Sequence, residues 1–144
     1  MTTLRKKLIE EFLEVITTLN RSISSRKDLF LQKYNLTRQQ AELLYFVERH
    51  KNNSIKTIAT FMNTTGSAAT QLVEGMVKSG YIERTQSLQD RRSVVITLSK
   101  QGKKKFSEFK NEHILHITKV VRNLTDKEVQ QLIMLRKKLI SDGQ

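Results

Sequence analysis

Residues 54–84 read SIKTIATFMNTTGSAATQLVEGMVKSGYIER, and this stretch decides the fold. Ser54 is a residue type that caps helix N-termini, and residues 63–66 then interrupt the short helix that it opens. A second helix follows, and its apolar positions recur at the spacing of a buried stripe: Ala69, Leu72, Val73 and Met76. Two short helices joined by a turn, the second with a polar outer face, are typical of a helix-turn-helix unit.

A β-hairpin is predicted directly after this unit. Gly80 stands where the end of a helix favours a left-handed residue, and the apolar period then changes to two. We expect one strand at residues 81–84 and its partner at residues 94–98. The polar loop between them, residues 85–93, is too long for a tight hairpin turn. A hairpin in this place makes the helix-turn-helix unit a winged one.

Further helices are predicted on both sides of the winged unit. Residues 1–36 carry apolar side chains every three or four positions, as in one long amphipathic helix. Residues 37–40 (TRQQ) form a capping box that opens the next helix, and residues 125–128 (TDKE) form a second box ahead of the last one. Between Ser99 and this second box the helical period returns. The chain contains no proline, which suits long uninterrupted helices.

Five short segments occur in order along the chain: IA at 58–59, ATQLV at 69–73, KSGYIER at 78–84, DRR at 90–92 and LSKQG at 98–102. In combination they resemble the multiple antibiotic resistance regulator (MarR) family of winged helix-turn-helix transcription factors. The resemblance implies a mainly α fold with a small β-hairpin wing. It also implies one domain, in which residues 37–102 form the DNA-binding lobe and residues 1–36 and 103–144 form dimerisation helices.

The same resemblance implies a homodimeric transcriptional regulator that binds double-stranded DNA. As is usual for the family, we expect it to act as a repressor. A two-fold dimer presents its recognition helices to half-sites ~34–36 Å apart, so the expected target is a pseudo-palindromic duplex. A cavity for a small-molecule effector is implied between the dimerisation helices and the lobe, whereas no cofactor is expected. The alternative is a winged-helix module for protein–protein interaction, without specific DNA binding.

DNA contacts are expected from the second helix of the unit and from the wing: Thr64, Thr65, Ser67, Thr70, Gln71, Arg84, Arg91 and Arg92. Adjacent arginines on a loop neutralise phosphates or enter a narrow minor groove, although an ordinary solvated loop is the alternative for this pair. Asp90 has the wrong charge for DNA, and we expect it to support the wing by holding an arginine in place. Thr64 and Thr65 also suit the cap of the helix.

Two positions depart from the family pattern. The family commonly has a basic residue where this chain has Gln71, and again where it has Gly75. The loss of these cations shifts the helix toward neutral hydrogen bonding, and glutamine pairs bidentately with adenine. An A·T-rich operator is therefore predicted. Gly75 weakens a helix by about 1 kcal/mol relative to alanine, and the sequence gives no reason for it.

The charge and residue composition limit which classes of function the chain can have. The chain has 26 Lys and Arg against 14 Asp and Glu, a net charge of +12, and residues 1–36, 37–102 and 103–144 carry +3, +4 and +5 of it. Because the charge is spread evenly, most of it does not mark a binding site. The chain has no cysteine, which excludes thiol-based regulation and Cys-ligated metals. His113 and His116 share a helix face, but no cluster completes a metal site, and no constellation typical of an enzyme occurs.

The sequence also bears on location. The N-terminal residues MTTLRKKLIEEF lack the apolar segment of a secretory signal. The longest apolar run is residues 43–47, far below the roughly 18 residues of a membrane span. We therefore expect a soluble, cytoplasmic protein without a membrane partner.

Overall fold

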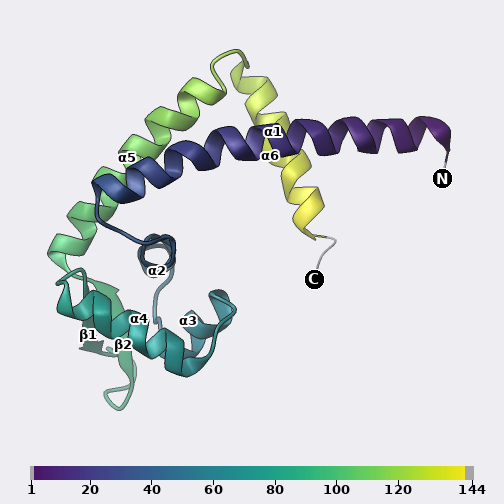
Figure 1. Cartoon of the computed structure of the whole chain (residues 1–144). Coiled ribbons are helices and arrows are strands. Elements are labelled where there is room, and N and C mark those ends of the chain that lie inside the picture. Colours follow the sequence, from purple (N-terminus) through teal and green to yellow (C-terminus); the bar gives the residue numbers. More distant parts are fainter. Residues whose placement is uncertain (1, 142–144) are drawn as a thin grey trace.

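The computed structural model of the protein describes residues 2–141. Along this range the elements are, in order, α1 (Thr3–Lys33), α2 (Arg38–Arg49), α3 (Ile55–Phe61), α4 (Gly66–Lys78), β1 (Ile82–Gln86), β2 (Val94–Leu98), α5 (Lys100–Val120) and α6 (Asp126–Ser141) (Figure 1). The predicted mainly α fold with a small β-hairpin is confirmed. Residue 1 and residues 142–144, which belong to the expected dimerisation segments, lie outside the described residues. Over residues 2–141, no helix is both long enough and apolar enough to cross a membrane.

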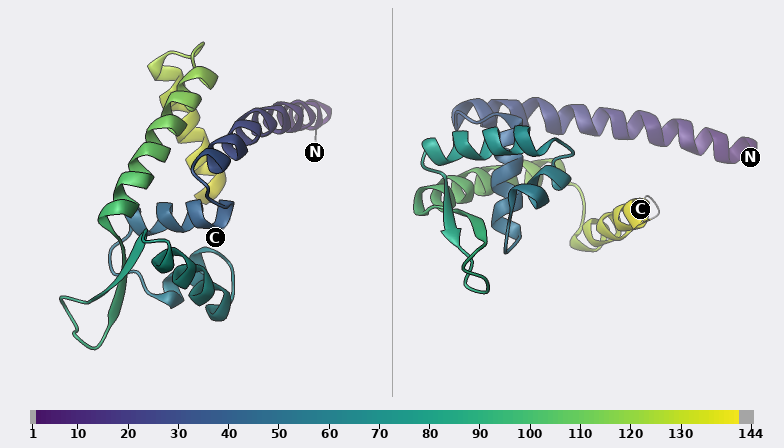
Figure 2. Two further views of the ribbon diagram at one scale, coloured as in Figure 1. Left: turned by 60° about the vertical axis from the view of Figure 1, so that its left-hand side comes forward. Right: turned by 90° about the horizontal axis from the view of Figure 1, so that it is seen from below.

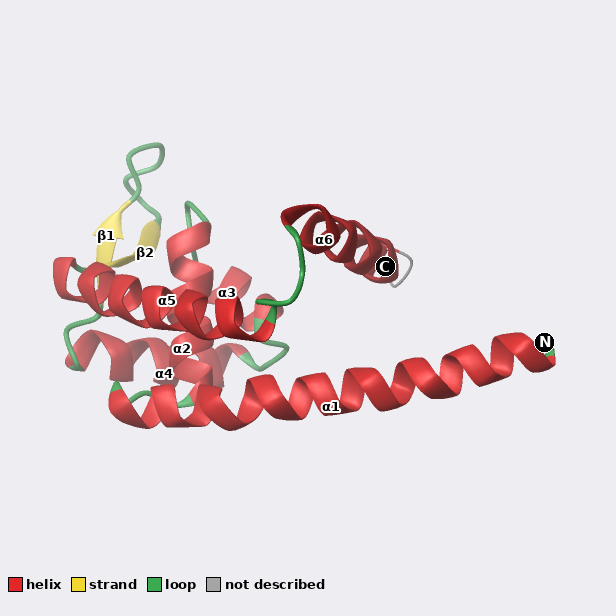
Figure 3. Ribbon diagram, turned by 90° about the horizontal axis from the view of Figure 1, so that it is seen from above, coloured by secondary structure: helices red, strands yellow, loops and turns green. Residues whose placement is uncertain are grey.

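The helix-turn-helix, the hairpin and α2 form a lobe at one end of the molecule. Helix α5 and the C-terminal part of α1 pack against α2, while α4 packs against α3 and β1 (Figures 1 and 2). The N-terminal part of α1 and the whole of α6 project away from this lobe, as Figure 3 shows. The tip of the hairpin lies at the end of the lobe far from α6 (Figure 1).

Side-chain hydrogen bonds set the starts of the helices. The capping box predicted at Thr37 is present, because Thr37 Oγ1 accepts from the Gln40 N–H at 3.2 Å and the Gln40 amide oxygen accepts from the Thr37 N–H at 2.8 Å. The box predicted at Thr125 is present too, with the Glu128 carboxylate accepting from the Thr125 N–H at 2.7 Å. Ser54 caps α3 as expected. These local rules therefore fix three of the helix starts.

Helices α1, α3 and α4 end with the same type of C-terminal cap. Each is followed by a residue in the left-handed region: Asn35 (φ +50°), Asn63 (φ +49°) and Gly80 (φ +78°). The next N–H then bonds a carbonyl five residues back, as in the 3.0 Å bond from Tyr81 N–H to Met76 O. The predicted left-handed glycine at the end of α4 is confirmed, and asparagine replaces glycine at the other two ends.

Strand β1 begins and ends later than the predicted range of 81–84. Its start is delayed because the Tyr81 N–H closes the end of α4 and is not available for the hairpin. Its end is extended because the antiparallel pairing continues as far as Gln86 opposite Val94. Strand β2 has the predicted bounds. The wing tip is consequently residues 87–93, two residues shorter than the predicted loop.

The hydrophobic core of the lobe packs against one face of α4. The largest fully buried side chains come from α2, α3, α4 and β2: Leu43, Leu44, Ile58, Val73, Met76 and Ile96. Leu31 and Phe106 extend this core to α1 and α5. Because the inner face of α4 is completely buried here, its outer face is left to solvent.

Helices α1 and α6 keep their apolar residues on the surface of the single chain. The exposed apolar side chains include Leu4, Leu8, Phe12, Val15 and Leu19 on α1, and Leu132, Ile133, Leu135, Leu139 and Ile140 on α6. Every described side chain of α6 is exposed apart from the half-buried Val129. The amphipathic stripe predicted for the first helix thus exists, and its N-terminal part is uncovered within residues 2–141.

Candidate nucleic-acid interface

Helix α4 presents a polar face because its apolar face is anchored in the core. Val73 and Met76 have no exposed surface. Ser67, Gln71 and Lys78 lie four and seven residues apart, which places them on one side of a helix, and all three are exposed. The structure therefore brings Ser67 and Gln71, two of the predicted DNA contacts, onto one outward face.

The three threonines near the start of α4 have different environments. Thr65 caps the helix, with Oγ1 accepting from the Ala68 N–H at 3.1 Å. Thr70 Oγ1 donates to the Gly66 carbonyl at 2.8 Å, so toward a ligand this hydroxyl retains only its acceptor capacity. Thr64 is exposed on the turn between α3 and α4, and its hydroxyl has no hydrogen-bond partner among the described residues. Of the three, Thr64 keeps the fullest hydrogen-bonding capacity.

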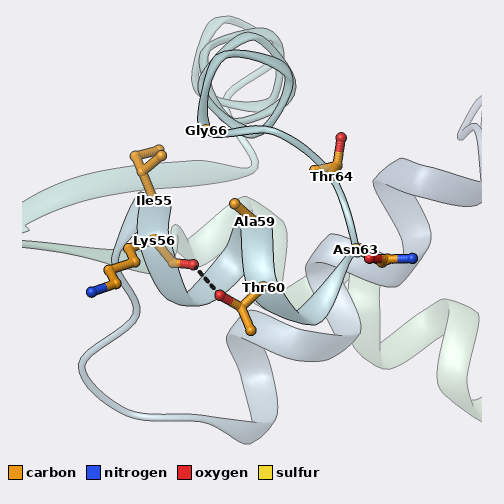
Figure 4. A pocket seen from close by; sticks show the side chains of 7 residues that line it. All are labelled: Ile55, Lys56, Ala59, Thr60, Asn63, Thr64 and Gly66. Carbon is orange, nitrogen blue, oxygen red and sulfur yellow. Dashed lines mark hydrogen bonds between the residues drawn. The ribbon is translucent and has the colours of Figure 1, made fainter.

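A hollow of about 600 Å³ opens between α3 and the start of α4 (Figure 4). Its lining consists of Ile55, Lys56, Ala59, Thr60, Asn63, Thr64 and Gly66. Lys56 is the only charged residue of these seven, so the lining is cationic. The sequence did not single out Lys56, because nothing distinguishes it there from other exposed lysines. It lines the same hollow as Thr64, which makes it a further candidate for contact with phosphate.

A second hollow, of about 340 Å³, lies between α4 and the hairpin. Its lining includes Thr70 and Arg84, two predicted DNA contacts, together with Glu74. The Arg84 guanidinium lies 4.0 Å from the Glu74 carboxylate, and both side chains are about half exposed. Such an exposed pair contributes little to stability, but it reduces the charge that Arg84 offers to DNA. This acidic partner was missed from the sequence because it belongs to another element.

The wing tip is closed by hydrogen bonds around Ser87. The Ser87 N–H donates to the Ser93 carbonyl at 2.9 Å, which joins the two ends of the tip. Ser87 Oγ accepts from the N–H groups of Gln89 and Asp90 at 3.2 and 3.3 Å, and the residue is buried. The sequence predicted only a polar loop here. A serine that turns back onto the loop gives this tip a defined shape.

Asp90 supports the wing through the backbone. Its Oδ1 accepts from the Arg92 N–H at 2.9 Å and its Oδ2 accepts from Ser93 Oγ at 3.1 Å. The carboxylate thus holds Arg92 through its main-chain N–H and not through its guanidinium group. Among the described residues, no ion pair involves Arg91 or Arg92, and both are exposed. Their guanidinium groups are therefore available to a polyanion.

Asn53 anchors the wing to the rest of the lobe, and sequence reasoning missed it. Its buried side-chain amide donates to the carbonyls of Val47, His50 and Ile96 at 3.3, 2.9 and 3.2 Å. Its backbone carbonyl accepts from the Ile96 N–H at 2.8 Å. One residue thus ties the end of α2 to β2. The only signal in the sequence was its position in a helix-terminating segment.

Two histidines lie in the contact between α1 and α5. His116 packs against Phe30 of α1 and is 6% exposed, and neither of its ring nitrogens has a hydrogen-bond partner. His113 stacks on Phe109, and its Nδ1 is also unpartnered. Burial lowers the pKa of His113, and the nearby positive charge of Lys27, with a contribution from His116, lowers it further.

A hydrogen-bonded cluster lies in the same contact. The Tyr34 hydroxyl donates to the Glu112 carboxylate at 2.7 Å, and Lys33 binds the same oxygen. Burial and this bond to Glu112 raise the pKa of Tyr34 to about 12. The two donors lower the pKa of Glu112. The cluster joins the end of α1 to α5, so the long helix is fixed to the lobe by polar as well as aromatic contacts.

The comparison with curated proteins finds transcriptional regulators. The HTH-type transcriptional regulator BilQ from Clostridium symbiosum is 30% identical over 100 residues, which cover 67% of this chain and 69% of that protein. The HTH-type transcriptional regulator YfiV from Bacillus subtilis is 30% identical over 98 residues, which cover 68% of this chain and 61% of that protein. The chain thus spans less than two thirds of the length of YfiV.

Solved structures show the same architecture. A MarR family protein from Bacillus stearothermophilus superposes with a TM-score of 0.82 at 19% identity, covering 95% of this chain and 96% of that one. A mutant of S. aureus MepR bound to an oligodeoxyribonucleotide superposes with a TM-score of 0.66 at 21% identity, covering 92% and 98%. The MarR family model matches residues 36–94, which include the whole helix-turn-helix and β1. The chain belongs to the MarR family of winged helix-turn-helix transcriptional regulators.

Proposed function

We propose that the protein is a homodimeric transcriptional regulator that binds duplex DNA with α4 in the major groove and the wing tip at the minor groove. The observation that carries this proposal is the pair of exposed arginines, Arg91 and Arg92, which have no ion pair among the described residues and lie on a tip whose shape is fixed by Ser87 and Asp90. The tip and α4 both belong to the end of the molecule far from α6 (Figure 1). A single duplex can therefore meet both.

The outer face of α4 supports base reading by neutral groups. Ser67 and Gln71 are the exposed polar side chains in its first two turns, and Thr70 adds an acceptor at the edge of this face. Gln71 can pair with adenine, and serine accepts either kind of partner, which favours an A·T-rich half-site. Thr64, the Thr65 cap and Lys56 fit backbone contacts at the start of the helix.

The assembly that we propose is a two-fold dimer built by α1, α5 and α6. Its support is the apolar surface that α1 and α6 leave exposed in the single chain. Burial of such a surface against a second copy is strongly favourable. The symmetry then places two copies of α4 on a pseudo-palindrome with half-sites ~34–36 Å apart.

Repression and a small-molecule effector complete the proposal. A dimer that covers two successive grooves of a promoter excludes other proteins from the same DNA, which makes repression the simplest outcome. A ligand that binds between the dimerisation helices and the lobe would act by changing the separation of the two α4 helices. A complete switch of occupancy requires a roughly 10⁴-fold preference of the ligand for one state.

A protein–protein interaction module is the second candidate. It is favoured by one observation: the outer face of α4 carries Glu74, and Lys78 is the only cation within the helix. A recognition helix with this little positive charge also suits a protein partner. In that case the wing arginines would contact an acidic protein surface.

The salt dependence of DNA binding tests the two candidates. We expect the protein to bind mixed duplex DNA with a steep negative slope of log affinity against log salt, because each neutralised phosphate contributes about −0.9. Arg91→Ala and Arg92→Ala should each weaken binding and flatten this slope by about one unit, whereas Lys110→Ala, at an exposed position of α5, should change neither. Binding that is absent or insensitive to salt would favour the protein-interaction module.

A further inference from the structure

The wing tip carries an apolar side chain that nothing in the chain covers. Leu88 has a relative exposure of 104%, the highest among the exposed large apolar side chains of the described residues. The others with a relative exposure above 55% belong to the long helices α1, α5 and α6, where a second copy can cover them, and Val94 of β2 follows at 54%. Leu88 belongs to the loop between β1 and β2, and the tip of this hairpin lies far from α6 (Figure 1). Its exposure needs a different explanation.

The position of Leu88 is fixed by its neighbours. Ser87, immediately before it, is buried and joins the two ends of the tip through its N–H. The N–H of Gln89, immediately after it, donates to Ser87 Oγ. Both flanking residues are therefore held against the loop, and the side chain between them is directed outward. A binding partner meets the backbone of this residue already in place, so little backbone entropy is lost when the leucine is buried.

The charges around Leu88 define the chemistry of that partner. Arg91 and Arg92 lie on the same tip with no acidic partner among the described residues, and the carboxylate of Asp90 is used by Arg92 N–H and Ser93. The partner must therefore be anionic and must also offer an apolar recess. The minor groove of DNA provides both, because phosphates line its rims and the sugar and base edges form its walls and floor.

We propose that Leu88 is an apolar wedge that enters the minor groove and partly unstacks one base step in each half-site. This inference rests on the proposed binding of DNA by the wing and adds a residue that acts without hydrogen bonds or charge. Apolar wedges of this kind bend a duplex toward the major groove.

The wedge adds specificity through the stiffness of DNA. Pyrimidine–purine steps such as TA unstack most easily, whereas A-tracts resist the deformation. The base step beneath the wing tip should therefore be a flexible one in the preferred operator. This selection is independent of the hydrogen bonds that Ser67 and Gln71 offer in the major groove.

The test measures affinity and DNA bending on duplexes selected by the wild-type protein from a random pool. Fluorescence energy transfer between the duplex ends reports the bend. We expect Leu88→Ser to weaken binding about tenfold, near the lower end of what burial of one leucine contributes, and to reduce the bend. The salt slope should stay unchanged, because no phosphate contact is lost. Leu88→Met should retain the bend, and the neighbouring Gln89→Ser serves as the matched control.

The outcomes separate the wedge from the function on which it rests. If Leu88→Ser bends DNA as the wild type does, the wedge is wrong, while a slope flattened by Arg91→Ala still supports the DNA-binding wing. If the wild-type protein shows no salt-dependent binding to any duplex, the proposed function fails and the wedge fails with it. Reduced bending by Leu88→Ser but not by Gln89→Ser supports the wedge.

Discussion

Asn53 shows how much of the lobe depends on one side chain. Its side-chain amide donates hydrogen bonds to three carbonyls, which belong to α2, to the turn after it and to β2. Asn53→Ala removes the donor from these acceptors, two of which are buried, and we expect the free energy of unfolding to fall by about 2–3 kcal/mol. Urea denaturation measures this loss. Asn111→Ala, at an exposed position of α5, is the control and should change stability by less than about 0.5 kcal/mol. Equal effects of the two substitutions would contradict the role assigned to Asn53.

Two interactions that sequence reasoning missed join separate elements. Asn53 bonds Ile96, and Arg84 pairs with Glu74 on the preceding helix. Neither relation leaves a periodic or spacing signal, because each depends on how two elements pack. The opposite holds for Thr37, whose partner is three residues away and whose capping role the sequence predicted.

At the scale of elements, the sequence predicted most of what the structure contains. The change of apolar period from three or four to two located the hairpin, and the capping motifs located the starts of α2, α3 and α6. The error in β1 arose because the end of α4 uses the Tyr81 N–H, a competition between two adjacent elements that periodicity does not register. The candidate site shows the same division between local pattern and packing. The polar residue types on α4 could be predicted from the sequence, whereas the defined shape of the wing tip could not.

The contact between α1 and α5 gives the protein a pH dependence of known sign. The pKa of His113 lies below its ordinary value of about 6.5 in the folded state, so the unfolded chain binds the proton more readily. Stability from this site is complete above about pH 6.5 and is lost as the pH falls through the folded-state pKa. The lowered pKa of Glu112 has the same sign but acts in a lower window, below about pH 4.5.

Thermal unfolding between pH 5.5 and 7.5 measures the histidine contribution separately. We expect the wild-type protein to lose stability toward pH 5.5, and His113→Phe, which preserves the stacking on Phe109, to flatten this dependence. His50→Phe is the matched control, because His50 also stacks on a phenylalanine, Phe46, but lies outside this contact. A profile that is as steep in His113→Phe as in the wild type would show that another group titrates.

At the scale of the whole molecule, a single chain leaves apolar side chains of α1 and α6 exposed to solvent. The apolar residues of α6 at positions 132, 135 and 139 follow a helical spacing, and all of them are exposed. The lobe has its own core, built from α2, α3, α4 and the hairpin with α5. A substitution on α6 should therefore act on assembly without unfolding the lobe.

Two glutamates on α6 make this separation measurable. We expect Leu135→Glu combined with Leu139→Glu to convert a dimer into a monomer in sedimentation equilibrium, because the substitutions place charges in a surface that must be buried. The helical content should persist, since both side chains are more than half exposed in the single chain. Gln130→Glu, on the opposite face of α6, adds charge without this effect. DNA binding gives the second readout: the monomer should keep its weak affinity for an isolated half-site and lose the gain that the dimer obtains when the two half-sites are linked, because only a dimer engages both at once. A double variant that remains dimeric would place the interface elsewhere on the molecule.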